Sequence, residues 1–160
     1  MPTKKQEMHY LIRAYREKTG QQSVNMHDVA KFAASQGWPM PAPKSALDRL
    51  AEQFSAAARE EVRKDEVTGR PYRANLAVTT WQGNEQFTLW TDIDEAPRPI
   101  AQKAFVQRRE QMVGDAVQLT FDVMHWNRVN EHDEPINMPL DFTDDVAWRL
   151  NAPDEDDKAA

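Results

Sequence analysis

The sequence predicts a mixed α+β protein. Three segments in the first 62 residues place apolar side chains at spacings of three and four, which is typical of amphipathic helices. From Tyr72 to Thr91 the pattern becomes extended and is interrupted by a short Gly-containing loop, which predicts a β-hairpin. From Ile100 to about Asn130 the pattern is helical again. We therefore expect three N-terminal helices, a hairpin, a long helix and a short C-terminal helix.

The first two helices are predicted from their end signals as much as from their periods. The first spans Lys4 to Thr19 and ends at Gly20, because glycine readily adopts the left-handed conformation of a C-terminal cap. The second follows Asn25, a good N-cap residue, and ends before Gly37. The apolar residues of the first are Met8, Leu11, Ile12 and Tyr15, and those of the second are Val29, Phe32 and Ala33.

The third helix is expected to begin near Pro43 or Lys44. Three prolines between Pro39 and Pro43 exclude a helix before it. Its apolar positions predict a buried face, which consists of Leu47, Leu50, Ala51, Phe54, Ala58 and Val62.

The hairpin follows a turn signal at residues 68–71. We expect its strands at Tyr72–Trp81 and Glu85–Thr91, joined through Gln82–Asn84. Trp81 and Trp90 flank this hairpin, and we expect them to stack on each other as a cross-strand or core pair.

The long helix is predicted from Ile100 to about Asn130. Prolines 97 and 99 flank its start, and the acidic residues of the segment 92–95 suit a helix N-terminus. Thirty helical residues span roughly 45 Å, which exceeds the width of a small domain. Either Gly114 breaks this helix, or part of it protrudes.

The C-terminal part is predicted to be polar and mostly extended. Prolines 135 and 139 bracket a strap, and Thr143 is expected to cap a short helix that carries Val146, Trp148 and Leu150. Residues 151–160 form an acidic tail that we expect to be disordered. The predicted organisation is a winged-helix-like domain at 1–92, the long helix at 93–130, the strap and short helix at 131–150, and the tail at 151–160.

Composition excludes several protein classes. The length of 160 residues suits one domain with an appendage, and the absence of cysteine excludes disulfide frameworks, thiolate metal sites and cysteine nucleophiles. The Gly-rich dinucleotide pattern, the P-loop and the His-Glu-x-x-His motif are absent, and no apolar stretch is long enough to suggest a membrane span. We therefore expect a cytoplasmic protein without a cofactor or a membrane association.

The net charge of −6 is unevenly distributed. Residues 1–64 contain 11 Lys and Arg against 7 Asp and Glu, whereas residues 116–160 contain 3 against 11. The first segment is therefore mildly basic and the last strongly acidic. Such an asymmetry is compatible with an N-terminal nucleic-acid contact, although a solvated acidic tail explains the second part equally well.

Three helices followed by a hairpin resemble the winged helix-turn-helix superfamily. The resemblance covers about residues 4–91 and rests on the order of elements, with the segments Asp28–Ala34 and Ser45–Leu50 in the second and third helices. It implies that the third helix enters the major groove and that the hairpin wing contacts the DNA backbone. The DNA-binding residues that it implies are Lys44, Ser45, Arg49, Arg63, Lys64, Arg70 and Arg73.

The first functional hypothesis is therefore a non-enzymatic DNA-binding protein, such as a transcription regulator or an accessory factor. It would act as a homodimer if the long helix buries its apolar side against a second copy. The alternative is a protein–protein adaptor that uses the same scaffold, the long helix and the acidic C-terminus, which would attract a basic partner, without contacting DNA.

A third, weaker hypothesis is a metal-dependent hydrolase or nuclease. The residues for it are the cluster His125, Glu131, His132, Asp133 and Glu134. They lack the paired-histidine spacing of a helical metal site, so a solvated polar turn is the favoured interpretation. Asp92, Asp94 and Glu95 resemble a carboxylate cluster, but the acidity of a helix start explains them without chemistry.

Overall fold

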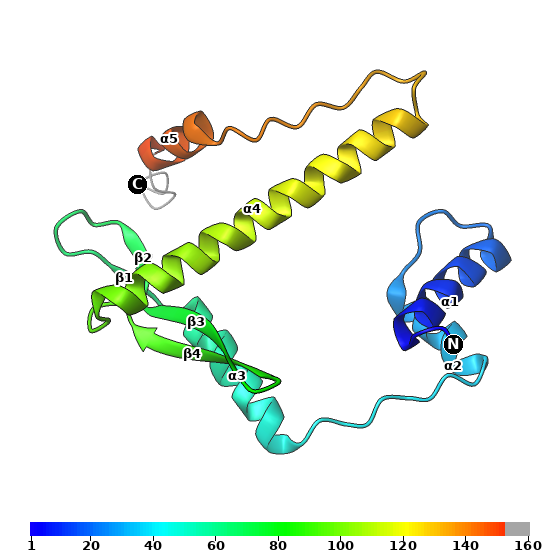
Figure 1. The fold of residues 1–160 in the computed structure, drawn as a ribbon, viewed down its shortest axis with the longest axis horizontal. Helices are drawn as coiled ribbons and strands as arrows, with labels where there is room; N and C mark the ends of the chain where they lie inside the picture. Colours follow the sequence, from blue (N-terminus) through cyan, green and yellow to red (C-terminus); the bar gives the residue numbers. More distant parts are fainter. Residues whose placement is uncertain (153–160) are drawn as a thin grey trace, which may run out of the picture. The chain divides into compact units, whose positions relative to one another are not determined.

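The computed structural model describes residues 1–152. In this part of the chain five α-helices and two two-stranded antiparallel sheets follow one another, so the predicted α+β class is confirmed (Figure 1). The chain divides into two units, one comprising Met1–Gln53 and the other beginning at Phe54. The division lies within the third helix.

The first unit is built on α1 (Lys4–Thr19) and α2 (Met26–Ser35). A capping box starts α1, because the Gln6 N–H donates to the Thr3 hydroxyl at 3.2 Å and the Thr3 N–H donates to the Gln6 side chain at 2.7 Å. Gly20 ends α1 at φ +70°, as predicted.

The start of α2 is also as predicted. The Asn25 side chain accepts a hydrogen bond from the His27 N–H at 2.8 Å. The two helices pack through Tyr15 and Phe32, whose ring centroids are 5.5 Å apart, and Val29 is the buried residue of α2. Local capping signals and a small apolar contact thus define this unit.

The third helix differs from its prediction. α3 spans Ala46–Glu60, and Ser45 caps it by accepting from the Asp48 N–H at 3.1 Å. The predicted buried face is wrong: no described residue of α3 is buried, and Leu47 and Phe54 are 76% and 68% exposed. Val62, predicted to belong to the helix, starts a strand instead.

A small hairpin follows that the sequence did not predict. β1 (Val62–Lys64) pairs with β2 (Pro71–Arg73), and strands of three residues are too short to show a period of two. Asp65 organises the connecting loop by accepting from the N–H groups of Thr68 and Val67, both at 2.9 Å. Both bonds hold the pKa of Asp65 below its ordinary value, and the bond from the Thr68 N–H has the larger effect.

The predicted hairpin is confirmed as β3 (Asn75–Gln82) and β4 (Glu85–Asp92), but its first strand begins at Asn75 and not at Tyr72, which belongs to β2. The two-residue turn between them contains Gly83 at φ +63°, a conformation that a residue with a Cβ rarely adopts.

The predicted tryptophan pair is wrong. The strand register places Ala77 opposite Trp90 and Gln86 opposite Trp81. Instead, the Arg59 guanidinium lies over the Trp90 ring, with its Cζ 5.6 Å from the ring centroid. Trp81 is 64% exposed. A hairpin pairs residues by register, and this register separates the two rings.

The long helix α4 runs without a break from Arg98 to Val129, so Gly114 does not interrupt it. It packs on β3 near its N-terminal end and continues beyond the hairpin (Figure 1). The contact is a small apolar core of Leu76, Val78 and Ala104, flanked by Ile93, Ala96, Ile100 and Ala101.

The start of α4 also corrects a prediction. Proline lies in its first turn as expected, but that turn contains no acidic residue. Asp92 and Asp94 lie before the helix and bind an arginine, as described below.

After α4 the chain forms an extended strap and then α5 (Thr143–Asn151). The Asn127 side chain fixes the strap, because it donates to the Ile136 carbonyl and accepts from the Ile136 N–H, both at 2.9 Å. Thr143 is the first residue of α5 rather than its cap. The N-cap position is held by Phe142, which forms no side-chain capping bond, and the preceding Asp141 accepts from the Thr143 N–H at 3.1 Å.

Two remaining predictions concern the C-terminus and the membrane. The predicted disordered tail at 151–160 lies outside the described residues from position 153 onward, and its first residue, Asn151, is still helical. Among residues 1–152, none of the helices combines the length and the apolar composition of a membrane span.

Candidate functional site

The seven residues proposed to contact DNA are distributed over both units. Lys44, Ser45 and Arg49 belong to the first. Lys44 forms an ion pair with Glu52, which raises the lysine pKa, and the Ser45 hydroxyl caps α3. In the first unit, therefore, one of the three residues is already bound to a carboxylate and a second is occupied by helix capping.

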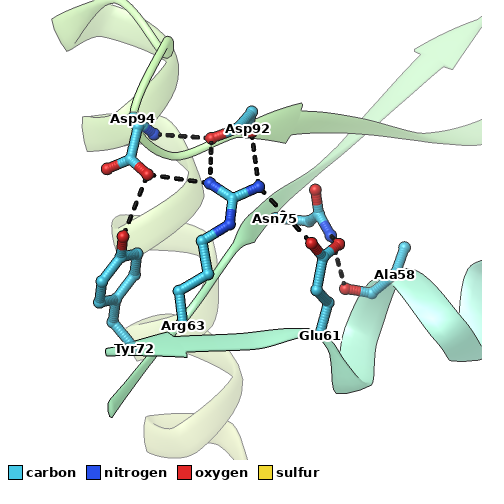
Figure 2. A network of polar contacts seen from close by, with 7 residues as sticks. All are labelled: Ala58, Glu61, Arg63, Tyr72, Asn75, Asp92 and Asp94. Carbon is cyan, nitrogen blue, oxygen red and sulfur yellow. Dashed lines mark hydrogen bonds and ion pairs between the residues drawn. The ribbon is translucent and has the colours of Figure 1, made fainter. Parts of the chain in front are cut away.

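The other four lie on or beside the β1–β2 hairpin of the second unit: Arg63, Lys64, Arg70 and Arg73. Arg63 points to the end of β4 and is the centre of a polar cluster (Figure 2). Its Nη1 and Nη2 donate to the two carboxylate oxygens of Asp92 at 2.9 and 2.8 Å, and its Nη1 also donates to Asp94 at 2.9 Å. Glu61 adds a more distant oxygen at 3.5 Å from Nη2.

The cluster connects α3 with all four strands of the second unit. The Tyr72 hydroxyl of β2 donates to Asp94 at 3.1 Å, and the Asn75 amide of β3 donates to the Ala58 carbonyl and to Glu61, both at 3.0 Å (Figure 2). Because one guanidinium joins β1 to the β4–α4 connection, we interpret this cluster as the structural anchor of the small hairpin.

The charges of the cluster affect each other's protonation. The bidentate bonds from Arg63 hold the pKa of Asp92 below its ordinary value, and the same bonds raise the pKa of Arg63. Partial burial raises the pKa of the Tyr72 hydroxyl, and its hydrogen bond to Asp94 adds to this effect. At neutral pH the cluster therefore contains a charged Arg63, a charged Asp92 and a neutral Tyr72.

A groove of about 890 Å³ lies in the second unit between the small hairpin, β3 and α4. Among residues 1–152, its walls contain the arginines Arg59, Arg73 and Arg108 and no aspartate or glutamate. None of these three arginines forms an ion pair with a described residue. In a chain with a net charge of −6 the groove is therefore locally cationic.

The floor of the groove includes the edge of β3 that faces away from β4. At Thr79 the side chain of Gln107 occupies this edge: Gln107 Oε1 accepts from the Thr79 N–H and Gln107 Nε2 donates to the Thr79 carbonyl, both at 2.9 Å. Backbone groups in an antiparallel pair alternate in direction with a period of two. The N–H and C=O of Ala77, two residues earlier, therefore also point away from β4 and into the groove.

The second notable surface lies along α4 from Phe105 onward, where apolar side chains are exposed on two sides. One stripe repeats every seven residues, which brings its members to nearly the same side of a helix. It consists of Phe105, Met112, Leu119 and Trp126, all between 41% and 58% exposed. The other consists of Val106, Val113, Val117, Phe121 and Met124.

The apolar exposure continues into the strap and α5. The exposed residues there are Ile136, Met138, Leu140, Phe142, Val146, Trp148 and Leu150. We call this set together with the two stripes the α4–α5 surface. Sequence periodicity located these residues on a helix but could not show that the rest of the chain leaves them uncovered.

The metal hypothesis gains no geometric support within residues 1–152. No group of three or more His, Asp or Glu side chains in this range is close enough to hold one ion. In the predicted region, His132 lies 3.7 Å from Glu131, and both side chains are exposed.

Comparison with known protein families, curated proteins and solved structures found no match for this chain. The groove, the Arg63 cluster and the α4–α5 surface are the features of this chain that bear on its function.

Proposed function

We propose that the chain is a non-enzymatic protein-interaction adaptor that assembles with a second copy of itself through the α4–α5 surface. The observation that carries this proposal is the apolar exposure on two sides of α4. A helix that is apolar on more than one side is normally buried in a larger core or in an assembly.

The α4–α5 surface is extensive. Its sixteen large apolar side chains on α4, the strap and α5 are between 39% and 77% exposed. Contiguous exposed apolar side chains are typical of the interfaces of obligate dimers. A second copy is the partner that carries the same surface and is always present at the same concentration.

Light scattering during size exclusion tests the assembly. We expect a particle of twice 18.4 kDa at tens of micromolar. Val113→Glu combined with Val117→Glu should convert it to the 18.4 kDa species, because burying two carboxylates in an apolar interface is costly.

The matched control adds the same charge at exposed polar positions of α4, as Gln102→Glu combined with His125→Glu, and should leave the mass doubled. A wild-type chain that elutes at 18.4 kDa throughout the concentration range would refute the self-assembly.

A second candidate function is the binding of duplex DNA, which requires that the first three helices and β3–β4 pack as a winged helix. One observation favours it: Lys64, Arg70 and Arg73 of the small hairpin form no ion pair with a described residue. Lys44 and Arg63 favour it less, since a phosphate would have to displace their carboxylates.

Salt dependence separates this candidate from the adaptor. If phosphate contacts drive binding, affinity for duplex DNA should fall steeply between roughly 50 and 200 mM salt, and Arg49→Ala or Arg70→Ala should weaken it. Absence of binding at 50 mM salt would exclude the DNA function.

A further inference from the structure

The groove beside β3 has two properties of a peptide-binding site. It exposes backbone hydrogen-bonding groups at a strand edge, and the described residues that form its walls include three arginines and no carboxylate. Neither property belongs to the α4–α5 surface described above.

Gln107 shows how a ligand would bind at this edge. Its carboxamide donates to the carbonyl and accepts from the N–H of the same residue, Thr79. A peptide group of an added β-strand makes the same kind of bonds along a strand edge. The Gln107 side chain therefore occupies one position of this edge, and no side chain of residues 1–152 forms a hydrogen bond with the next outward-pointing position, Ala77.

We propose that this groove binds an extended acidic peptide segment of a partner protein by strand addition to β3. The peptide backbone pairs with Ala77 and either replaces the Gln107 carboxamide at Thr79 or binds next to it. Residues 75–79 offer roughly 16 Å of edge, enough for about five residues of an added strand.

The charge of the groove selects the chemistry of the peptide. Arg73 extends from β2 on one side and Arg108 from α4 on the other, and both line the same groove. Guanidinium groups bind carboxylates through paired hydrogen bonds, so acidic side chains of the added strand match both walls. An oligonucleotide would satisfy the arginines but has no peptide groups to pair with the strand edge.

This inference rests on the proposed adaptor function, for which it supplies the class of partner. Apart from Phe105, which lines the groove and also belongs to the α4–α5 surface, it uses different residues from the self-assembly. A chain that stays monomeric can still bind the peptide, and a dimer can fail to bind it, so the two proposals can be refuted separately.

Fluorescence anisotropy of the full chain tests the site with a labelled peptide of alternating Glu and Val, seven residues long. We expect saturable binding, and at least a tenfold loss of affinity for Arg73→Ala combined with Arg108→Ala. Arg109→Ala is the matched control, because Arg109 is a neighbouring arginine of α4 outside the groove, and it should change affinity less than twofold. Far-ultraviolet circular dichroism confirms that each variant is folded.

Two further probes examine the backbone pairing. The same peptide with N-methylated amides on alternate residues should lose at least tenfold in affinity, because it cannot donate to the strand edge. Gln107→Ala should bind the unmodified peptide as tightly as the wild type or more tightly, since it clears the edge at Thr79.

Four results would overturn the proposal: no saturable binding of the acidic peptide, equal binding of a Lys–Val peptide, undiminished binding of the N-methylated peptide, or preference for a single-stranded oligonucleotide. A fifth result concerns a variant that ends at Ala152. If this variant binds the peptide several times more tightly than the full chain, the groove is assigned to the acidic end of the protein itself, and the assignment to a partner is overturned.

Discussion

The two ends of α4 differ although they belong to one unbroken helix. Near the N-terminal end, Ile100 and Ala104 pack against Leu76 and Val78 of β3. The part of the helix beyond Arg108 is at least as rich in apolar residues as the part before it, but its apolar side chains are exposed on two sides. The comparison shows that an apolar pattern predicts a helix without predicting what covers it. The hairpin covers one end, and we assign the other to a second copy of the chain.

The largest effect that tests this contrast is expected at the covered end. Leu76→Ala should lower the free energy of unfolding by about 2–4 kcal/mol, because it opens a cavity in a core of few residues. Urea denaturation followed by circular dichroism measures this loss.

The matched change at the other end is Leu119→Ala, in the exposed stripe. In a self-assembled protein its cost should grow as protein concentration rises, whereas the cost of Leu76→Ala should not. If both costs are independent of concentration, the two ends of α4 do not differ in the way proposed.

A smaller effect is expected where α4 meets the strand edge. Gln107→Leu keeps the approximate size of the side chain but leaves the Thr79 N–H and C=O without their partner. We expect a loss of about 1–2 kcal/mol in the free energy of unfolding. Hydrogen exchange of the Thr79 amide should be slower than that of solvent-exposed amides in the wild type and faster in the variant, which would locate the effect at this residue. Unchanged exchange at Thr79 would contradict it.

A substitution at Gly114 is expected to raise the stability of the chain, whereas the substitutions above lower it. Gly114 lies within α4, and a Cβ added there would meet no atom within 4 Å. Gly114→Ala should therefore raise the stability of the chain by about 0.5–1 kcal/mol through helix propensity. If the second copy packs closely over this position, the added methyl group will weaken the dimer instead. The two outcomes show whether the interface includes Gly114.

The smallest expected effect concerns the Arg63 cluster, whose groups are partly exposed to solvent. The pKa of Asp92 is lower in the folded chain than in the unfolded chain, so its contribution to stability is fully present above the ordinary Asp value, about 3.9. That contribution is lost as pH falls through the folded pKa. The stability difference between the wild type and Arg63→Met should therefore be constant from pH 5 to 7 and should shrink below pH 4. A difference that does not change with pH would contradict the ionic role of the cluster.

Local signals in the sequence predicted the features that depend on a few neighbouring residues. Asn25 and Gly20 mark the start of α2 and the end of α1, and the turn around Gly83 marks the β3–β4 hairpin. The errors concern longer-range relations. The apolar residues of α3 indicate a buried face, but the periodicity of one helix does not reveal whether another element covers it.

The candidate site was less predictable for the same reason. Arg63 binds Asp92 and Asp94, which are 29 and 31 positions away, and Gln107 binds Thr79 across 28 positions. No periodicity or motif connects residues at such separations, and glutamine is not a residue type that indicates a site. Six of the seven residues assigned to DNA contact could be selected for their charge, but only the structure shows that carboxylates already bind Lys44 and Arg63.

The Gln107 carboxamide has one more consequence, for the behaviour of the protein in concentrated solution. An uncovered strand edge can pair with the same edge of another molecule and start aggregation. Because the Gln107 side chain blocks the edge at Thr79 from a position within the same chain, it interrupts the run of backbone groups that such pairing requires. One uncharged side chain thus allows the hairpin to keep an accessible edge at Ala77 without offering an uninterrupted one to other copies.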